Sequence, residues 1–458
     1  MKSKKFLAVL TATVMAAGLL AGCGGSGSNN SGNSGSGSTG SSDSKAAGKV
    51  YFLNFKPEQA TQWEDIAKQY TKETGVPVTV QTAASGTYEQ ILKSEIAKKD
   101  APTLFQINGP VGFQNWKEYC LDLSDTKLYS WLRDPSIAVK DGDGVFGIPY
   151  VVEGYAIIYN LEIMDKYFAL DGAKVKSMEE INDFAKLQAV VEDMTSKKDD
   201  LGIEGVFAST SFAPGEDWRW QTHLMNLPIY YEYKDKGVSK EDEISFEYNK
   251  EFKAIFDLYL NNSITEPTML GSKTVEDSMS EFALGKVAMV QNGNWAWGQI
   301  SGISGNVVKE ENVKMLPIYT GMPEDSKQGL CTGTENFFSV NSKSPKEDQE
   351  ATIAFVEWLF SSDEGKDAVT NKLGFISPFN TFKDDDNPTD PLAKEVIRFM
   401  DNSDLTSVAW VFTTFPSQTF KDDLGAALLQ YAQGQEEWDK LVTDTINSWK
   451  TEMEASNQ

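Results

Sequence analysis

The sequence predicts an α/β protein of two lobes, each a doubly wound sheet flanked by helices. The chain has 458 residues, 40% of them hydrophobic and 24% charged, which is enough for two domains with separate cores. From Lys49 onward, short apolar runs typical of strands alternate with segments of helical period, as in parallel sheets. No internal repeat and no linker between lobes follows. We therefore expect the chain to cross from lobe to lobe more than once.

Residues 1–22 have the pattern of a secretory signal peptide. A basic start with Lys2, Lys4 and Lys5 precedes an apolar run too short to span a membrane comfortably. The next residues, Leu20-Ala-Gly-Cys23, resemble the bacterial lipobox, which implies lipidation of Cys23; the alternative is an ordinary signal with a chance cysteine. A linker rich in Gly, Ser and Asn completes residues 23–48 and should span roughly 25–30 Å. We expect a domain anchored by lipid at the extracellular face of the cytoplasmic membrane, as in Gram-positive bacteria.

The charge balance excludes several classes of partner. The formal net charge is −25, and loss of the signal peptide, with three lysines and no acidic residue, would bring it to −28. Nucleic acid and anionic lipid surfaces are therefore poor partners. Cys120 and Cys331 are the only cysteines after Cys23 and could form one disulfide or remain unpaired.

The first lobe begins with strands and helices in alternation. Strands are expected at 50–53, 76–80 and 103–107, and helices at 61–74 and from a capping box at Thr87 to Lys98. With right-handed crossovers, the loops after the three strands open on one edge of a parallel sheet. Lys56, Ser85 and Asn108 lie in these loops. They should form one wall of a ligand cleft.

Residues 141–147 contain G-x-G-x-x-G but do not predict a nucleotide site. A dinucleotide fingerprint needs its glycines to open a helix, whereas here an extended apolar run with a proline follows. A tight turn between two strands explains the glycines better. A strand at 153–160 and a helix from Ser177 to Thr195 should follow, whereas 201–245 is less regular.

The segment Phe282–Trp297 is the expected centre of the binding site. A helix over 275–284 should end at Gly285, a strand should cover 287–290, and Asn294 should cap a helix whose first turn carries Trp295 and Trp297. Indoles placed at the carboxyl end of a strand form a platform for a flat, partly apolar ligand. The remaining expected helices are at 249–260, 348–360 (opened by a capping box at Ser344), 391–400, 418–433 and 436–453.

Several segments together resemble family 1 of the bacterial extracellular solute-binding proteins, the carbohydrate receptors of ABC importers. These segments are Gly147-Ile-Pro-Tyr150, Glu153, Ile158-Tyr-Asn160, Phe282-x-x-Gly-Lys-x-Ala-Met289, Gly293-x-Trp295 and Ser361-Ser-Asp-Glu-Gly365. The resemblance implies a periplasmic-binding-protein-like fold that closes on a sugar. It implies lobes at 49–150 with 317–375 and at 151–316 with 376–458, with crossings near 148–153, 315–320 and 374–379. An oligosaccharide ligand, ABC permease partners, a monomeric state and the lack of a cofactor, metal or catalytic residue are implied too.

Asn292-Gly-Asn-Trp-Ala-Trp297 is also similar to the N-G-P-W-A-W segment of maltose-binding proteins, with Asn294 in place of the proline. In those proteins a glutamate and a first-strand lysine fall near Glu153 and Lys56. Their Asp-Arg pair after the third strand is replaced here by Asn108-Gly-Pro. The sugar therefore need not be maltose.

Trp295 is the expected stacking platform. For Trp297, packing in the core is the alternative to a role in binding, because residues two apart point about 200° apart around a helix. Glu153, Asn108, Lys56 and Glu335 are expected to supply polar contacts. Further expected binding residues are Trp218, Trp220, Trp410, Phe412 and Ser85.

Two alternatives stay open. One is a lipid-anchored glycoside hydrolase that works with two carboxylates, and the other is the same fold with a non-sugar solute. His223 is the only histidine, and no hydrolase or zinc motif accompanies it.

Overall fold

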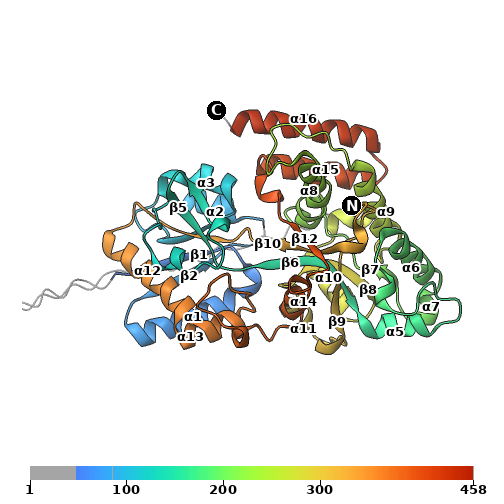
Figure 1. Cartoon of the computed structure of the whole chain (residues 1–458), viewed down its shortest axis with the longest axis horizontal. Helices are drawn as coiled ribbons and strands as arrows, with labels where there is room; N and C mark the ends of the chain where they lie inside the picture. The colour runs from blue at the N-terminus through green and yellow to red at the C-terminus, as the bar shows by residue number, and fades with distance from the viewer. Residues whose placement is uncertain (1–47, 85, 457–458) are drawn as a thin grey trace, which may run out of the picture. The chain divides into compact units, whose positions relative to one another are not determined.

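The computed structural model describes residues 48–84 and 86–456, in which two six-stranded sheets lie in separate groups of helices (Figure 1). The signal, Cys23 and almost all of the linker lie outside the described residues, as does Ser85. We call each sheet with its covering helices a lobe. The predicted two-lobed α/β class is confirmed.

The first sheet is parallel at one end and antiparallel at the other. Its order is β2-β1-β3-β11-β5-β4, in which β1 pairs in parallel with β2 and β3, and the remaining pairs are antiparallel. The strands are β1 (Val50–Asn54), β2 (Val78–Thr82), β3 (Leu104–Ile107), β4 (Val139–Asp141), β5 (Gly144–Pro149) and β11 (Phe337–Val340). The predicted turn in 141–147 is confirmed as the β4–β5 hairpin.

Helices cover both faces of the first sheet because its strands are buried on both sides. In β1, Phe52 packs with Trp63 of α1, and its neighbour Leu53 packs on the opposite face with Leu92 of α2. The helices of this lobe are α1 (Ala60–Thr74), α2 (Tyr88–Glu95), α3 (Pro110–Trp116), α4 (Lys127–Ser130), α12 (Lys346–Ser361) and α13 (Asp363–Asp367).

The second sheet has the order β12-β10-β6-β8-β7, with β9 paired to β6. Tyr155 and Ile157 of β6 face one core, and Ala156 and Ile158 face the other, as the period of two requires. The strands are β6 (Glu153–Asn160), β7 (Gly205–Phe207), β8 (Val287–Gly293), β9 (Val313–Leu316), β10 (Gln328–Gly333) and β12 (Thr406–Ala409).

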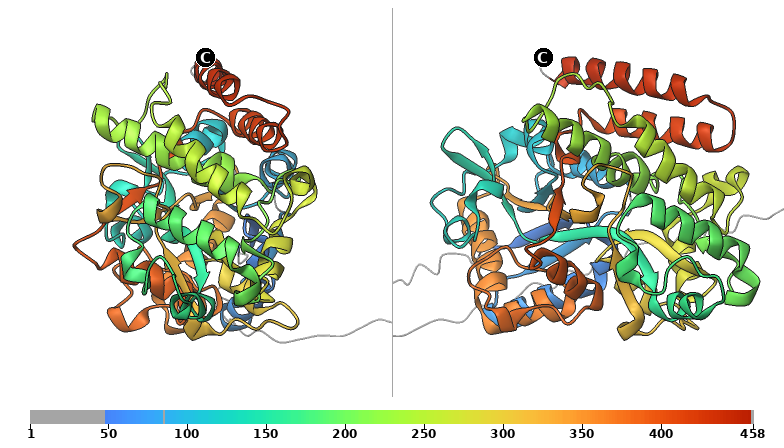
Figure 2. Two further views of the ribbon diagram at one scale, coloured as in Figure 1. Left: turned by 90° about the vertical axis from the view of Figure 1, so that its right-hand side faces the viewer. Right: turned by 45° about the vertical axis from the view of Figure 1, so that its right-hand side comes forward.

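The helices of the second lobe include the antiparallel pair α15 and α16 at the C-terminal end (Figure 2). They are α5 (Leu161–Ala169), α6 (Phe184–Ser196), α7 (Lys198–Leu201), α8 (Asn226–Lys236), α9 (Asn249–Asn261), α10 (Val275–Ala283), α11 (Ala296–Ser301), α14 (Pro391–Met400), α15 (Gln418–Ala432) and α16 (Trp438–Ser456).

The chain passes between the sheets more than once, as expected. It leaves the first sheet after β5 at Pro149 and enters the second with β6 at Glu153, and it returns between β10 and β11. β10 falls in the range 317–375 that the sequence assigns to the first lobe, yet it pairs with β6 and β12 of the second sheet. The exact limits of the lobes stay a prediction.

The capping boxes predicted at Thr87 and Ser344 are not formed, and the helix predicted from Ser177 begins later. The Thr87 hydroxyl donates to the Ala84 carbonyl instead, and Pro345 takes the cap position of α12. Ser177 precedes only a short 3-10 turn, and α6 begins at Phe184 with Asp183 as its cap.

Region 201–245 is more regular than the sequence predicts. It contains a π-helix at Arg219–Leu224 and then α8, which is buried on nearly every side of its first two turns and so lacks an amphipathic period.

Both described cysteines, Cys120 and Cys331, are buried and free. Within residues 48–84 and 86–456, no helix is both long and apolar enough to cross a membrane.

Gly365 of α13 is predicted to be essential for stability. A Cβ at this position would lie 2.3 Å from the Trp358 carbonyl oxygen and 2.7 Å from the Leu359 Cα, both backbone atoms of α12. Gly365→Ala should lower the free energy of unfolding by about 2–4 kcal/mol, measured by urea denaturation. The matched control is Gly298→Ala in α11, where no atom lies within 4 Å, and it should be neutral or stabilise by up to about 1 kcal/mol. Equal effects of the two substitutions would contradict this account.

Asp217 is predicted to make stability fall as the pH rises. Its carboxylate packs against Gly425 of α15, and burial, aided by Asp422, raises its pKa to about 6, against about 3.9 in an unfolded chain. The folded protein therefore holds the extra proton between about pH 4 and pH 6, and this contribution to stability is lost as the pH rises through 6. Asp217→Asn should raise the free energy of unfolding at pH 7.5 by about 1–2 kcal/mol, after allowance for partial solvent screening, and change it little at pH 4. Denaturation at both pH values checks this, and an equal gain at both would rule out titration as the cause.

Candidate functional site

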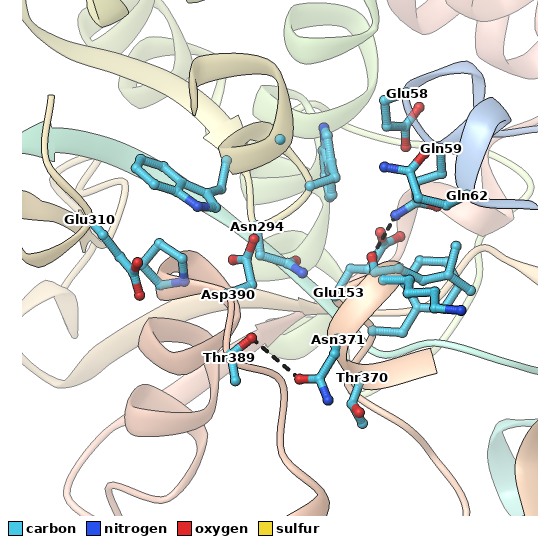
Figure 3. A pocket seen from close by; sticks show the side chains of 18 residues that line it. Glu58, Gln59, Gln62, Glu153, Asn294, Glu310, Thr370, Asn371, Thr389 and Asp390 are labelled. Atoms are coloured by element: carbon cyan, nitrogen blue, oxygen red, sulfur yellow. Dashed lines mark hydrogen bonds between the residues drawn. The ribbon is translucent and has the colours of Figure 1, made fainter. Parts of the chain in front are cut away.

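A pocket of about 270 Å³ lies where the two lobes meet, and residues from both lobes line it (Figure 3). The first lobe contributes Glu58, Gln59, Gln62 and residues 370–375. The second lobe contributes Glu153, Asn294, Trp295, Trp297, Gly298, Glu310 and residues 389–391.

Trp295 is held by the glycine two residues before it. A Cβ on Gly293 would lie 2.1 Å from the indole Cζ3 of Trp295, so the ring rests on the bare backbone at the end of β8. Any side chain at position 293 would displace the indole. This contact gives the Gly293-x-Trp295 motif a physical reason.

Trp295 and Trp297 both line the pocket, although their spacing on a helix predicts opposite directions. Trp295 is the N-cap of α11, and Trp297 is the second residue of that helix. Asn294 does not cap α11 as predicted. Its Oδ1 instead accepts from the Gly154 amide at 2.9 Å, which ties the Trp295 segment to β6.

Lys56 and Glu153 form a buried ion pair beside the pocket. The Lys56 Nζ lies 2.7 Å from Glu153 Oε1 and 3.7 Å from Glu58 Oε1, and 5.5 Å from the ring centroid of Trp295. Asn336 donates to the other oxygen of Glu153 at 2.8 Å. The Asn54 side chain exchanges hydrogen bonds with the Lys56 backbone and so fixes the loop after β1.

Burial and neighbouring charges shift the pKa values of Lys56 and Glu58. Burial would lower the pKa of the Lys56 ammonium, but Glu153 and Glu58 outweigh it and raise that pKa. Burial raises the pKa of Glu58, and the charge of Lys56 opposes this shift. Lys56 is therefore a permanent cation at neutral pH.

Four of the predicted aromatic residues gather around His223. The imidazole stacks on Tyr155, with centroids 4.2 Å apart, and contacts Trp218, Trp295, Trp410 and Phe412 at 5.0 to 6.1 Å. Burial and then the charge of Arg219 lower the pKa of His223 well below its ordinary value. His223 is thus neutral, and it serves as the packing centre of these rings.

Two of these rings have further supports. The Arg219 guanidinium carbon lies 4.3 Å from the ring centroid of Trp218. The Trp410 ring rests on Gly333 of β10, where a Cβ would come within 2.6 Å of it.

Of the predicted residues that the structure describes, only Glu153, Trp295 and Trp297 line the pocket, and three others have contacts elsewhere. Trp220 packs against Phe212, Phe256 and Tyr259 in the core. Asn108 turns its Oδ1 back toward Gly112 in the first turn of α3. Glu335 is half-buried in the loop between β10 and β11, where burial raises its pKa. A role in binding for each of these residues stays a prediction.

The sequence did not indicate Glu58, Gln59, Gln62 or the lining from residues 370–375 and 389–391. The only local signal was Asp390-Pro391, a cap followed by proline at the start of α14. Burial raises the pKa of Asp390 to about 6, although its Oδ1 accepts from the amides of Leu392 and Ala393. No cluster of three potential metal ligands occurs in the part of the chain that the structure describes.

Comparisons with known proteins agree with this architecture. No curated protein sequence matches the chain. A chitin oligosaccharide binding protein superposes with a TM-score of 0.70 at 17% identity, and the match covers 90% of this chain and 99% of that one. RafE in complex with raffinose gives 0.67 at 16% identity, over 88% and 99% of the two chains. Maltose-bound T. maritima MalE3 gives 0.66 at 15% identity, over 88% and 100%. At these identities the likeness establishes the fold.

Family membership rests on the sequence. Residues 65–395, about three quarters of the chain, match the family described as bacterial extracellular solute-binding protein. This span includes Glu153 of β6, Trp297 of α11 and, between β8 and α11, Trp295. The chain therefore belongs to the bacterial extracellular solute-binding proteins.

Proposed function

We propose that the protein captures an oligosaccharide between its lobes and delivers it to the permease subunits of an ABC importer. The observation that carries the proposal is the pocket in which two indoles meet carboxylate and amide side chains from both lobes. Indoles stack on the apolar faces of sugar rings, and carboxylates and amides accept or donate hydrogen bonds to hydroxyls. Proteins of this fold with raffinose or maltose bound support a sugar as the ligand class.

The free energy of binding to be expected for a sugar requires more than one stacked indole. Burial of about 100 Å² of a sugar face on one indole yields roughly 2.5 kcal/mol. Micromolar affinity requires about 8 kcal/mol. Trp295 and Trp297 together with polar contacts to Glu153 and its neighbours can supply this sum.

A lipid on Cys23 would hold the protein at the outer surface of the membrane, and the linker up to residue 48 would let it reach the permease. We propose lobe closure as the event that follows binding, because only a closed state contacts the sugar from both sides.

The contacts of the Glu153 carboxylate favour binding without chemistry over hydrolysis. Both of its carboxylate oxygens are engaged, one by Lys56 and one by Asn336. A general acid or base must reach the glycosidic bond with a free carboxyl oxygen, and neither oxygen of Glu153 is free of a protein partner. Incubation of the protein with oligosaccharides should therefore yield no product, and turnover would refute the proposal.

A calorimetric and thermal-shift screen tests the ligand class. The panel comprises maltodextrins, raffinose-type galactosides, xylo-oligosaccharides and manno-oligosaccharides. A sugar at one hundred times its dissociation constant should stabilise the protein by about 2.7 kcal/mol, which raises the unfolding temperature measurably. Spermidine and inorganic phosphate serve as non-sugar comparisons. A response to one of these and to no sugar would favour the alternative of a non-sugar solute.

Trp295→Ala should weaken the binding of any sugar found in that screen by tenfold or more, on the order of 1.4 kcal/mol. The indole stacks on the ligand but rests on Gly293, so its loss should leave the fold intact. Titration calorimetry measures the change, with circular dichroism as the check of folding. Trp358→Ala is the matched control, because Trp358 lies on α12 and hydrogen bonds Glu73 outside the pocket. Unchanged affinity in Trp295→Ala would transfer the platform to Trp297 or Trp410.

A further inference from the structure

Arg219 is a buried cation without a paired counter-charge. It is 2% exposed, and its three guanidinium nitrogens have no hydrogen-bond partner among the described residues. Burial lowers its pKa to about 9, and Glu216 opposes this shift, so the side chain stays protonated at neutral pH. The Glu216 Oε2 accepts instead from the Val275 amide at 2.9 Å. The guanidinium therefore carries its charge away from water without a bonded acceptor.

Such a residue lowers the stability of the fold. Removal of a cation from water is unfavourable unless its donors are satisfied, and apolar side chains of similar volume often stabilise a protein at such positions. Residues that break this rule are expected at functional sites, where they are retained at a cost in stability. The surroundings of Arg219 should therefore show what its charge is for.

The guanidinium of Arg219 lies over the indole of Trp218, with its Cζ 4.3 Å from the ring centroid. A planar guanidinium stacks on aromatic faces, and the attraction is stronger away from water. The backbone carbonyl of Arg219 accepts from Gln291 Nε2 of β8 at 2.9 Å. β8 ends at Gly293, on which the Trp295 indole rests. Arg219 thus joins Trp218 to the strand that supports Trp295.

Arg219 also acts on both rings that contact Trp295. Among the described residues these rings are Trp218 and His223, at centroid distances of 6.0 and 5.6 Å. The guanidinium stacks on Trp218, and its charge, after burial, lowers the pKa of His223. Arg219 and His223 belong to the π-helix Arg219–Leu224, a rare element that is frequent at functional sites. The surroundings of the Trp295 indole therefore depend on Arg219 in two ways.

We propose that Arg219 is a positioning residue of the binding site, whose guanidinium holds the Trp218 indole and, through it, the Trp295 indole beside the pocket. This rests on the proposed function, in which Trp295 stacks on a sugar. The ligand does not reach the buried guanidinium, which acts only through the rings. A side chain retained for binding and not for folding has a distinct signature, because its loss weakens binding while the protein becomes more stable.

Arg219→Met in the mature protein tests for this signature, because it removes the charge and keeps an unbranched apolar side chain. The unfolding temperature should rise by several degrees, and titration calorimetry should show an affinity about fivefold lower for any sugar that the unaltered protein binds. Arg219→Lys keeps a cation over the indole and should lose less affinity. A lower unfolding temperature in Arg219→Met, or an unchanged affinity, would overturn the inference and leave the proposed function standing.

Arg398→Met is the matched control. The Arg398 guanidinium also lies 4.3 Å from the centroid of an adjacent ring, that of Phe399, but it pairs with Glu395 at 2.7 Å and does not line the pocket. Its loss should lower the unfolding temperature, since a buried carboxylate loses its partner, and should leave the affinity unchanged. Equal losses of affinity in the two variants would overturn the inference.

Near-ultraviolet circular dichroism tests the positioning without a ligand. The indoles of Trp218 and Trp295 are close enough to couple, so the aromatic bands report their mutual orientation. Arg219→Met should change these bands, and the change should be smaller in a Trp295→Phe background. An unchanged spectrum, or an equal change in that background, would overturn the inference. Failure of the unaltered protein to bind any sugar would instead refute the proposed function, and the spectrum and the unfolding temperature would still decide the role of Arg219.

Discussion

The buried ion pair between Lys56 and Glu153 is the interaction on which the arrangement of the site depends. The two side chains are 6% and 3% exposed, so both charges are removed from water at a cost of several kcal/mol each. The structure offsets this cost with a 2.7 Å contact and a second donor, Asn336, on the free oxygen of Glu153. Loss of one partner would leave an uncompensated buried charge. The loop after β1, the start of β6 and the approach to β11 are therefore held together by electrostatics at the junction of the lobes.

The aromatic rings packed around His223 are positioned at the same junction of the lobes. β6 begins at Glu153, and its third residue, Tyr155, carries the stacked imidazole of His223, around which the other rings pack. A charged imidazole would be costly in this buried position, and the low pKa keeps it neutral. The ion pair and the rings around His223 are thus positioned by Glu153 and Tyr155, the first and third residues of one strand. Rigid backbone elements rather than long loops hold them.

Much of the fold and part of the site could be predicted from the sequence, for identifiable reasons. Strand ends in an α/β sheet lie at known edges, so Lys56 after β1 and Trp295 after β8 could be assigned to a cleft before any contact was known. Gln59 and Asp390 could not, because their place in the pocket depends on how α1 and α14 pack across the lobes. Trp295 and Trp297 both line the pocket, and which of them contacts a ligand stays a prediction. α8 escaped prediction because burial on nearly every side removes the periodic pattern.

The contact between Gly293 and the Trp295 indole has a consequence for the thermodynamics of capture. An aromatic side chain that is free to rotate loses conformational entropy when a ligand immobilises it, at about 0.5–1.5 kcal/mol for a mobile side chain. The indole of Trp295 is already confined against the backbone of β8 before any ligand arrives. The conformational entropy of this indole is therefore lost when the chain folds and is not lost again on binding. If Trp295 stacks on the ligand as proposed, association at this indole should need little reorganisation of the protein, and Gly293 would contribute to affinity through the indole that it holds.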